Sequence, residues 1–247
     1  MRRIQYYIMI ILIISIIMIS YASASVNIVN DATYNLYKSA QNKLYNADYK
    51  EATQDLMNLL NLYLLDPCPQ QIYLDLIYAY YKLNDLKSAN NYIEHFFKLY
   101  PNHKHFDYVL YMHGVINMCL DEDNKKLIKY LNINWFDRNP VYACIAFHTF
   151  VRLIRQYPDS QYSLDAYKRL IFLKNRVAEY ELSIVKFYSK KHAYISVIAR
   201  VEKMLYHFPD TQATRKALYY MQQAYQNIYL PDQAKKVAKI ITANPVY

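Results

Sequence analysis

The sequence predicts an all-α fold, a solenoid of about five helix pairs. Glycine occurs once in the 247 residues, where average usage of about 7 % would give roughly 17. Tight β-hairpin turns and phosphate-binding loops need several glycines, so a β-barrel, a β-sandwich and most nucleotide enzymes are excluded. From Asp31 onward the apolar residues recur at helical spacing instead.

A repeated register supports this fold. At three places a small or apolar residue precedes a proline by twelve residues, and the last two prolines lie in the matching strings YPDSQ and FPDTQ. Proline ends the second helix of a pair, and the Asp, Ser or Thr after it can cap the next helix. This is the pattern of tetratricopeptide repeats, in which a small residue lies where two antiparallel helices cross. The three pairs are Ala89 and Pro101, Ala146 and Pro158, and Val197 and Pro209.

The elements follow from these signals in chain order. Leu36, Ala40 and Leu44 share one helical face, and Ala52 and Ala234 have the phase of a crossing residue in the first and last pairs. Asn139-Pro140 predicts an N-cap followed by proline at the first helical position. The expected pairs are 31–45 with 48–64, 70–83 with 86–99, 105–120 with 140–156, 161–189 with 191–207, and 212–228 with 231–243.

The one glycine, Gly114, falls inside a predicted helix. Glycine there costs about 1 kcal/mol relative to alanine. We therefore expect the backbone of this helix to approach a neighbour closely.

The N-terminus, residues 1–24, is predicted to be a signal peptide or an uncleaved anchor. Two arginines precede an apolar run at 6–19, and the segment ends in Ala22-Ser23-Ala24, so cleavage is expected after Ala24. The run is shorter than the ~20 residues that a spanning helix prefers, although adjoining residues could extend it. Residues 25–247 are then the repeat domain, expected to be soluble.

Residues that could carry chemistry are few. No H-E-x-x-H or G-x-S-x-G motif occurs, and His103 and His105 are the only histidines close together. We therefore expect no enzyme activity, no metal and no cofactor. Of the three cysteines, Cys68 lacks a local histidine partner, whereas Cys119 and Cys144 could approach each other across adjacent helices, either as a disulfide or as two small packed residues.

The charge is strongly asymmetric. Residues 160–247 carry 14 Lys and Arg against 6 Asp and Glu, a net of +8 out of a formal +9 for the whole chain. Such a half suits an acidic protein partner or an anionic surface, or it is a solvated face. An exported chain seldom meets nucleic acid, so no nucleic acid partner is expected. The 30 tyrosines suit core packing and also the concave, peptide-binding surface of a repeat solenoid.

Five strings carry a resemblance to a known family. In this order and spacing they resemble the BamD family, tetratricopeptide lipoproteins of the machinery that assembles β-barrel proteins in the outer membrane, and the resemblance covers about residues 31–244. The strings are LDLIYAYYK at 74–82, DYVLYM at 107–112, RLIFLK at 169–174, FPDTQATR at 208–215 and KVAKII at 236–241.

The resemblance implies a non-enzymatic scaffold at the periplasmic face of the outer membrane. The C-terminal repeats, 160–244, would dock on the POTRA region of BamA, and Arg200 matches the family arginine that contacts BamA. The N-terminal repeats, 31–100, would receive the C-terminal signals of unfolded barrel proteins. Lys50 and Tyr63 match positions implicated there, with Lys50 replacing an arginine and losing its planar fork. Other lipoproteins of the complex are further candidate partners.

The sequence departs from this family at its N-terminus. No cysteine precedes Cys68, so the acylated cysteine of the family lipobox is missing and retention would rest on BamA or on an uncleaved signal. The loop at 64–67, Leu-Leu-Asp-Pro, also departs from the Pro and Gly pattern usual in the family. A periplasmic repeat protein that coordinates envelope or cell-division processes is the alternative function; it would share the repeats and the signal but not the five strings.

Overall fold

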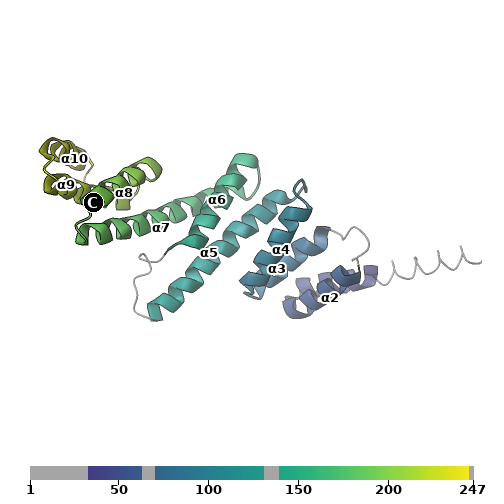
Figure 1. Ribbon diagram of the computed structural model, residues 1–247. Coiled ribbons are helices and arrows are strands. Elements are labelled where there is room, and N and C mark those ends of the chain that lie inside the picture. Colours follow the sequence, from purple (N-terminus) through teal and green to yellow (C-terminus); the bar gives the residue numbers. More distant parts are fainter. Residues whose placement is uncertain (1–32, 63–69, 131–138, 245–247) are drawn as a thin grey trace, which may run out of the picture. The chain divides into compact units, whose positions relative to one another are not determined.

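The computed structural model describes residues 33–62, 70–130 and 139–244, and the regular secondary structure of these ranges is α-helical (Figure 1). The chain divides into two compact units, residues 1–100 (the N-terminal unit) and 101–247 (the C-terminal unit). Both consist of antiparallel helix pairs, so the predicted all-α fold of the tetratricopeptide-repeat class is confirmed. The predicted signal at residues 1–24 and the loop at 64–67 lie outside the described residues.

The N-terminal unit contains two helix pairs. A helix at residues 33–45 precedes α2 (Tyr49–Leu62), and α3 (Gln70–Lys82) precedes α4 (Leu86–Leu99). The helices pack in sequence, α2 on α3 and α3 on α4. The core that joins the two pairs is formed by Ala40, Leu56, Leu59, Ile72 and Leu76.

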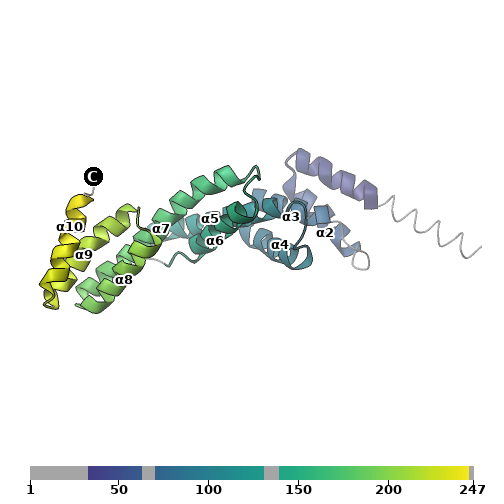
Figure 2. The same ribbon diagram turned by 90° about the horizontal axis from the view of Figure 1, so that it is seen from above.

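The C-terminal unit contains three helix pairs. Each helix packs on the next, and α7 also packs on α9, so the long α7 contacts helices of all three pairs (Figure 2). The helices are α5 (Phe106–Tyr130), α6 (Val141–Gln156), α7 (Ser163–Lys190), α8 (Tyr194–His207), α9 (Gln212–Asn227) and α10 (Pro231–Ala243).

The residues predicted to lie at helix crossings are buried, as the register required. Ala52, Ala89, Ala146 and Val197 are 0 % exposed, and Ala234 is 4 % exposed. Small side chains at these points let the helix axes approach, so the twelve-residue register correctly located the crossings.

Two predicted boundaries differ from the structure. The third pair begins with a helix that runs to Tyr130, ten residues beyond the expected end at 120, because no proline or glycine stops it. Pro140 is the N-cap of α6 and not its first helical residue: its carbonyl accepts the first helical bond, from Cys144 N–H at 2.8 Å, while its own ψ of 53° is not helical.

The turns inside four of the helix pairs share one geometry. Each contains a residue with positive φ, followed by a residue whose N–H donates to the carbonyl five positions earlier, as in a Schellman motif. These bonds are 2.9–3.0 Å long. None of the four positions is glycine, although glycine is the residue that adopts this conformation without strain. The four residues are Ala47 (φ 66°), Asn84 (φ 58°), His192 (φ 55°) and Tyr229 (φ 59°).

The single glycine lies where α5 crosses α6. A Cβ at Gly114 would come within 2.4 Å of the Cε1 and Cζ atoms of Phe150, which is fully buried. The close approach expected from the sequence is confirmed, and the contact requires a residue without a side chain.

None of the described helices combines the length and the apolar character that a membrane span requires.

Candidate partner-binding sites

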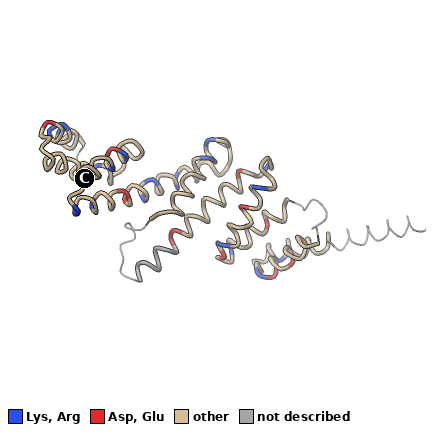
Figure 3. Tube along the Cα trace, in the orientation of Figure 1, with Lys and Arg blue, Asp and Glu red and all other residues tan. Residues whose placement is uncertain are grey.

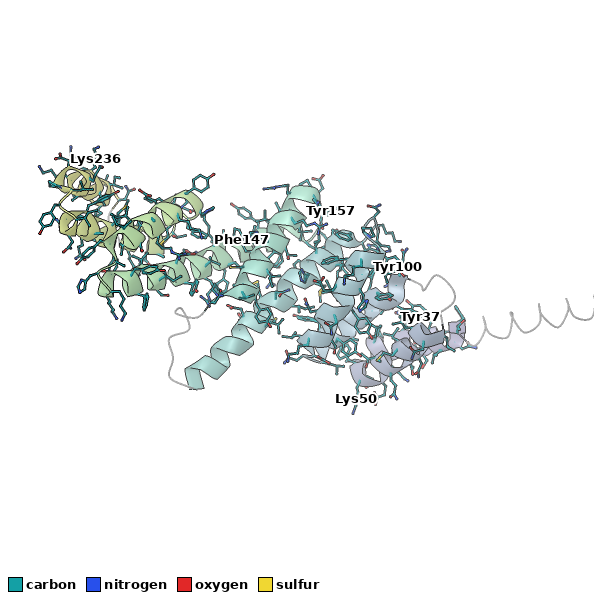
Figure 4. The ribbon with its side chains drawn as sticks, viewed as in Figure 1. Tyr37, Lys50, Tyr100, Phe147, Tyr157 and Lys236 are labelled. Atoms are coloured by element: carbon teal, nitrogen blue, oxygen red, sulfur yellow. The ribbon has the colours of Figure 1, made fainter. Side chains whose placement is uncertain are left out.

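Lys50 lies in the first turn of α2 in the N-terminal unit. Its side chain is exposed and forms no ion pair within the described part of the chain, and Figure 4 shows it pointing away from the helices of this unit. The backbone carbonyl of Lys50 accepts a hydrogen bond from Thr53 Oγ1 at 2.8 Å. This bond is internal to α2 and does not involve the ammonium group. An exposed, uncompensated cation is available to a carboxylate of a partner.

Aromatic side chains lie at the start of α2, in the same helical turn as Lys50, and on α3. The rings of Tyr49 and Tyr78 meet edge to face with centroids 6.1 Å apart, and Lys82 Nζ lies 5.5 Å from the Tyr78 centroid. Tyr78 is 37 % exposed. The start of α2 and the middle of α3 therefore combine basic and aromatic groups at one surface, the composition expected of a site for an extended peptide.

The helices behind this surface are held by polar contacts. Lys43 Nζ and Ser39 Oγ bind Asp55 Oδ2 at 2.6 and 3.0 Å, which joins the helix at 33–45 to α2. Between that helix and α3, Asp75 accepts hydrogen bonds from Tyr37 at 2.9 Å and from Gln41 at 2.6 Å.

Burial changes the acidity of this last pair. It raises the pKa of the Asp75 carboxyl, while the hydrogen bonds that Asp75 accepts act in the opposite direction. Burial, together with the Asp75 charge, also raises the pKa of the Tyr37 hydroxyl. Tyr37 therefore remains a hydrogen-bond donor to Asp75 at neutral pH. Tyr63, the other predicted residue of this site, lies outside the described residues.

Arg200 lies on α8 in the C-terminal unit, where it forms an ion pair with the neighbouring helix. Its Nη1 donates to Glu181 Oε2 of α7 at 2.8 Å, and Lys203 Nζ lies 3.9 Å from the other carboxylate oxygen. The Glu181 side chain is only 12 % exposed, whereas those of Arg200 and Lys203 are 27 % and 54 % exposed. Arg200 thus forms an intramolecular ion pair, and its side chain remains partly exposed.

A second, buried ion pair lies further along α7. Arg176 Nε and Asp121 Oδ2 of α5 are 3.3 Å apart, with side chains 1 % and 9 % exposed. Burial lowers the pKa of the Arg176 guanidinium, and Asp121 opposes that change. The pair ties α7 to α5 inside the unit, so its role is structural.

Cys119 and Cys144 are both half-buried and are not joined by a disulfide in this structure, which agrees with the alternative of two small packed residues. Burial raises the pKa of Cys144, which lowers its reactivity as a nucleophile. His103 and His105 lie in the turn before α5, with ring centroids 5.6 Å apart. The described residues hold no group of three or more potential metal ligands.

The acidic partners of Arg200 and Arg176 were missed by the sequence analysis. Glu181 and Asp121 lie 19 and 55 residues from the arginines that they bind, so no local spacing connects them. A signal did exist, because Glu181 occupies the inward phase of α7 between buried Ala178 and Leu182. A charged residue at such a position requires a partner, but the sequence does not say which one.

The fold and these surfaces together define a helical-repeat protein of the tetratricopeptide class. Figure 3 shows lysine and arginine positions distributed along the backbone of α7 to α10, where the sequence places its excess of positive charge. Repeat proteins of this class use such surfaces to bind peptides and other proteins.

Comparison with known proteins identifies the family. Residues 30–240 match the family model YfiO, described as "Outer membrane lipoprotein". The chain is 38 % identical over 214 residues to the outer membrane protein assembly factor BamD of Buchnera aphidicola, with 86 % of each chain covered. It is 37 % identical over 211 residues to the BamD of Vibrio cholerae, with 85 % of this chain and 87 % of that one covered. The chain therefore belongs to the YfiO/BamD family.

Among solved structures, MamA AMB-1 matches over 87 % of this chain and 92 % of that chain, with 11 % identity and a TM-score of 0.35.

Proposed function

We propose that this protein is a non-enzymatic scaffold subunit of the machinery that assembles and inserts β-barrel proteins into the outer membrane, at its periplasmic face. The observation that carries the proposal is the family match over residues 30–240, with relatives whose names state a role in outer membrane protein assembly. The helical-repeat fold and the exposed basic side chains of both units support a role in binding other proteins.

The C-terminal repeats are proposed to dock on the POTRA region of BamA through Arg200. A guanidinium carries five N–H donors, and Glu181 engages Nη1. The remaining donors are available to a carboxylate of BamA, and Glu181 holds the fork in a fixed orientation. Glu181 is thus a positioning residue for Arg200, and the net positive charge of this half favours an acidic partner.

The test compares Arg200→Lys with Arg200→Ala, and Lys203→Ala serves as the control on the same helix. Arg200→Lys retains a cation for Glu181 but loses the planar fork, so we expect normal thermal unfolding and weaker co-purification of BamA from native membranes. Losing a buried interfacial arginine pair costs about 2–5 kcal/mol of binding. Arg200→Ala should weaken co-purification further and also lower stability, because Glu181 loses its partner. Lys203→Ala should change both readouts little.

Two outcomes would contradict this assignment. If Arg200→Lys binds BamA as well as the unmodified chain does, Arg200 serves the fold and not the interface. If BamA does not co-purify even with the unmodified chain, the proposed function itself is wrong, and a periplasmic role in envelope or division coordination takes its place.

The N-terminal repeats are proposed to receive the C-terminal signals of unfolded barrel proteins at Lys50. Its side chain is exposed in the same first turn of α2 as Tyr49, whose ring meets that of Tyr78, so this end of α2 offers a cation for a terminal carboxylate and aromatic groups for an apolar side chain of the signal. Tyr63 remains a predicted member of this site. Lys50→Ala should reduce cross-linking of a barrel-protein C-terminal peptide. The control is Lys87→Ala, at an exposed lysine of α4, which should leave cross-linking unchanged. An equal loss of cross-linking in the two variants would refute the site.

Association with the membrane is proposed to need no lipid on this chain. No cysteine precedes Cys68, so metabolic palmitate labelling should give no signal. Carbonate washing should release the protein if the chain is cleaved after Ala24, and resistance to washing would indicate an uncleaved anchor. The same membranes would show whether other lipoproteins of the machinery co-purify.

A further inference from the structure

A cleft of about 490 Å³ lies between α7 and α9 of the C-terminal unit. The residues that line it come from these two helices, and α8, which carries Arg200, contributes none of them. Among the described residues that line the cleft, none carries a carboxylate. The lining consists of Lys186, Lys216, Tyr219, Tyr220 and Gln223.

The two lysines of this cleft have no carboxylate partner among the described residues. Several other basic residues of α7 and α8 do have one: Arg169 binds Asp165, Lys174 binds Asp210 and Arg200 binds Glu181. No ion pair involves Lys186 or Lys216 in the part of the chain that the structure describes, although Lys216 is half-buried. Two ammonium groups at one cleft repel each other, and a bound anion relieves that repulsion.

The remaining lining residues indicate what accompanies the anion. Tyr219 is 46 % exposed and offers an apolar face, whereas Tyr220 packs partly against the core of the unit and is held in place. The Gln223 amide can both donate to and accept from a peptide bond. The cleft therefore offers lysines for a carboxylate, a tyrosine for an apolar group and an amide for a peptide backbone. An extended acidic peptide supplies all three groups.

We propose that this cleft binds an acidic segment of a partner protein, with a carboxylate between Lys186 and Lys216 and a neighbouring apolar side chain on Tyr219. The site is additional to the proposed docking through Arg200 and does not depend on it. A lipid surface fits less well, because flat anionic membranes favour openly exposed lysines such as Lys236 and Lys239 of α10. Lys236 is marked on that helix in Figure 4.

The experiment measures peptide binding to the full-length chain by fluorescence anisotropy in low salt. The probe is a fluorescein-labelled hexapeptide with one Asp, one Glu and one Phe, and the matched probe has Asn, Gln and an amidated C-terminus instead. The variant is Lys186→Gln with Lys216→Gln. The control is Lys236→Gln with Lys239→Gln, which removes the same charge from exposed positions of α10. Circular dichroism establishes that both variants are folded.

We expect the acidic peptide to bind and its amide counterpart to bind at least about tenfold more weakly, a difference of 1.4 kcal/mol. The cleft variant should lose about tenfold in affinity while the control changes about twofold or less, and added salt should weaken binding. Equal losses in the two variants would overturn the proposal, because net charge alone would then explain binding. Absence of peptide binding, or binding to phosphatidylglycerol vesicles alone, would overturn it as well.

Discussion

Gly114→Ala tests whether close packing of α5 on α6 decides the stability of the C-terminal unit. The added methyl carbon would lie 2.4 Å from two ring carbons of Phe150 and 2.8 Å from a third, whereas carbon atoms in contact are separated by about 3.5–4.0 Å. The ring or the helix must therefore move by about 1 Å. Phe150 is fully buried, so it has no solvent to move into.

Two effects of this substitution oppose each other. Alanine is a better helix former than glycine by about 1 kcal/mol, but overpacking a core costs about 1–3 kcal/mol and more for severe overlaps. With an overlap of about 1 Å against an aromatic ring, the packing cost should dominate. We expect a net loss of about 2 kcal/mol in the free energy of unfolding.

Urea denaturation followed by circular dichroism measures this loss, with Phe150→Leu and the double variant completing a thermodynamic cycle. Because leucine vacates part of the ring volume, Gly114→Ala should cost less in the Phe150→Leu background, by about 1–2 kcal/mol. If the Gly114→Ala variant is as stable as the unmodified chain, the reasoning is refuted, because the gain from helix propensity would then be at least as large as the cost of overpacking. Strict additivity in the cycle would refute the assigned contact.

Three further predictions concern buried or strained groups. Burial, with a smaller contribution from Arg152, lowers the pKa of His113 from 6.5 to about 4. Because the unfolded chain binds this proton at a higher pH than the folded chain, the free energy of unfolding should fall by about 3 kcal/mol as the pH drops from 6.5 towards 4. His113→Gln should remove this dependence from a pH series of urea titrations. Asp121→Asn should cost about 3 kcal/mol in urea titrations by removing the carboxylate that binds Nε of the buried Arg176, and an unchanged midpoint would contradict the pairing. Tyr229→Gly should raise the melting temperature, because the relief of about 1–2 kcal/mol of left-handed strain exceeds the unfolded-state entropy that glycine adds, about 0.4–1 kcal/mol, whereas glycine at the helical position Gln226 should lower it.

Helix positions were predictable from this sequence because their determinants are local. Proline after the second helix of a pair and small residues at a fixed distance before it act within a few turns, and Ala89, Ala146 and Val197 are buried as expected. The end of α5 was not predictable in the same way. Residues 121–130 contain no strong helix breaker, so the helix continues through them. Their acidic residues give this segment a polar composition that is also typical of a loop.

The candidate sites were predictable only as single residues. The resemblance located Arg200, but Glu181, which orients it, comes from another helix and became visible only when α7 packed on α8. The cleft between α7 and α9 depends likewise on tertiary packing, since Lys186 and Lys216 are 30 residues apart in the sequence. A net charge of +8 indicates an acidic partner without indicating which lysines lack a carboxylate.

The use of glycine in this chain determines how it tolerates mutation. Its one glycine stands where volume is limiting, while the four left-handed turns contain Ala, Asn, His and Tyr. A turn residue with a Cβ costs about 1–2 kcal/mol, and less when it is Asn or Asp, so exchanges among such residues at the turns alter stability in small steps. At position 114 any side chain meets the same aromatic ring. Mutational tolerance should therefore be graded at the four turns and close to zero at the helix crossing.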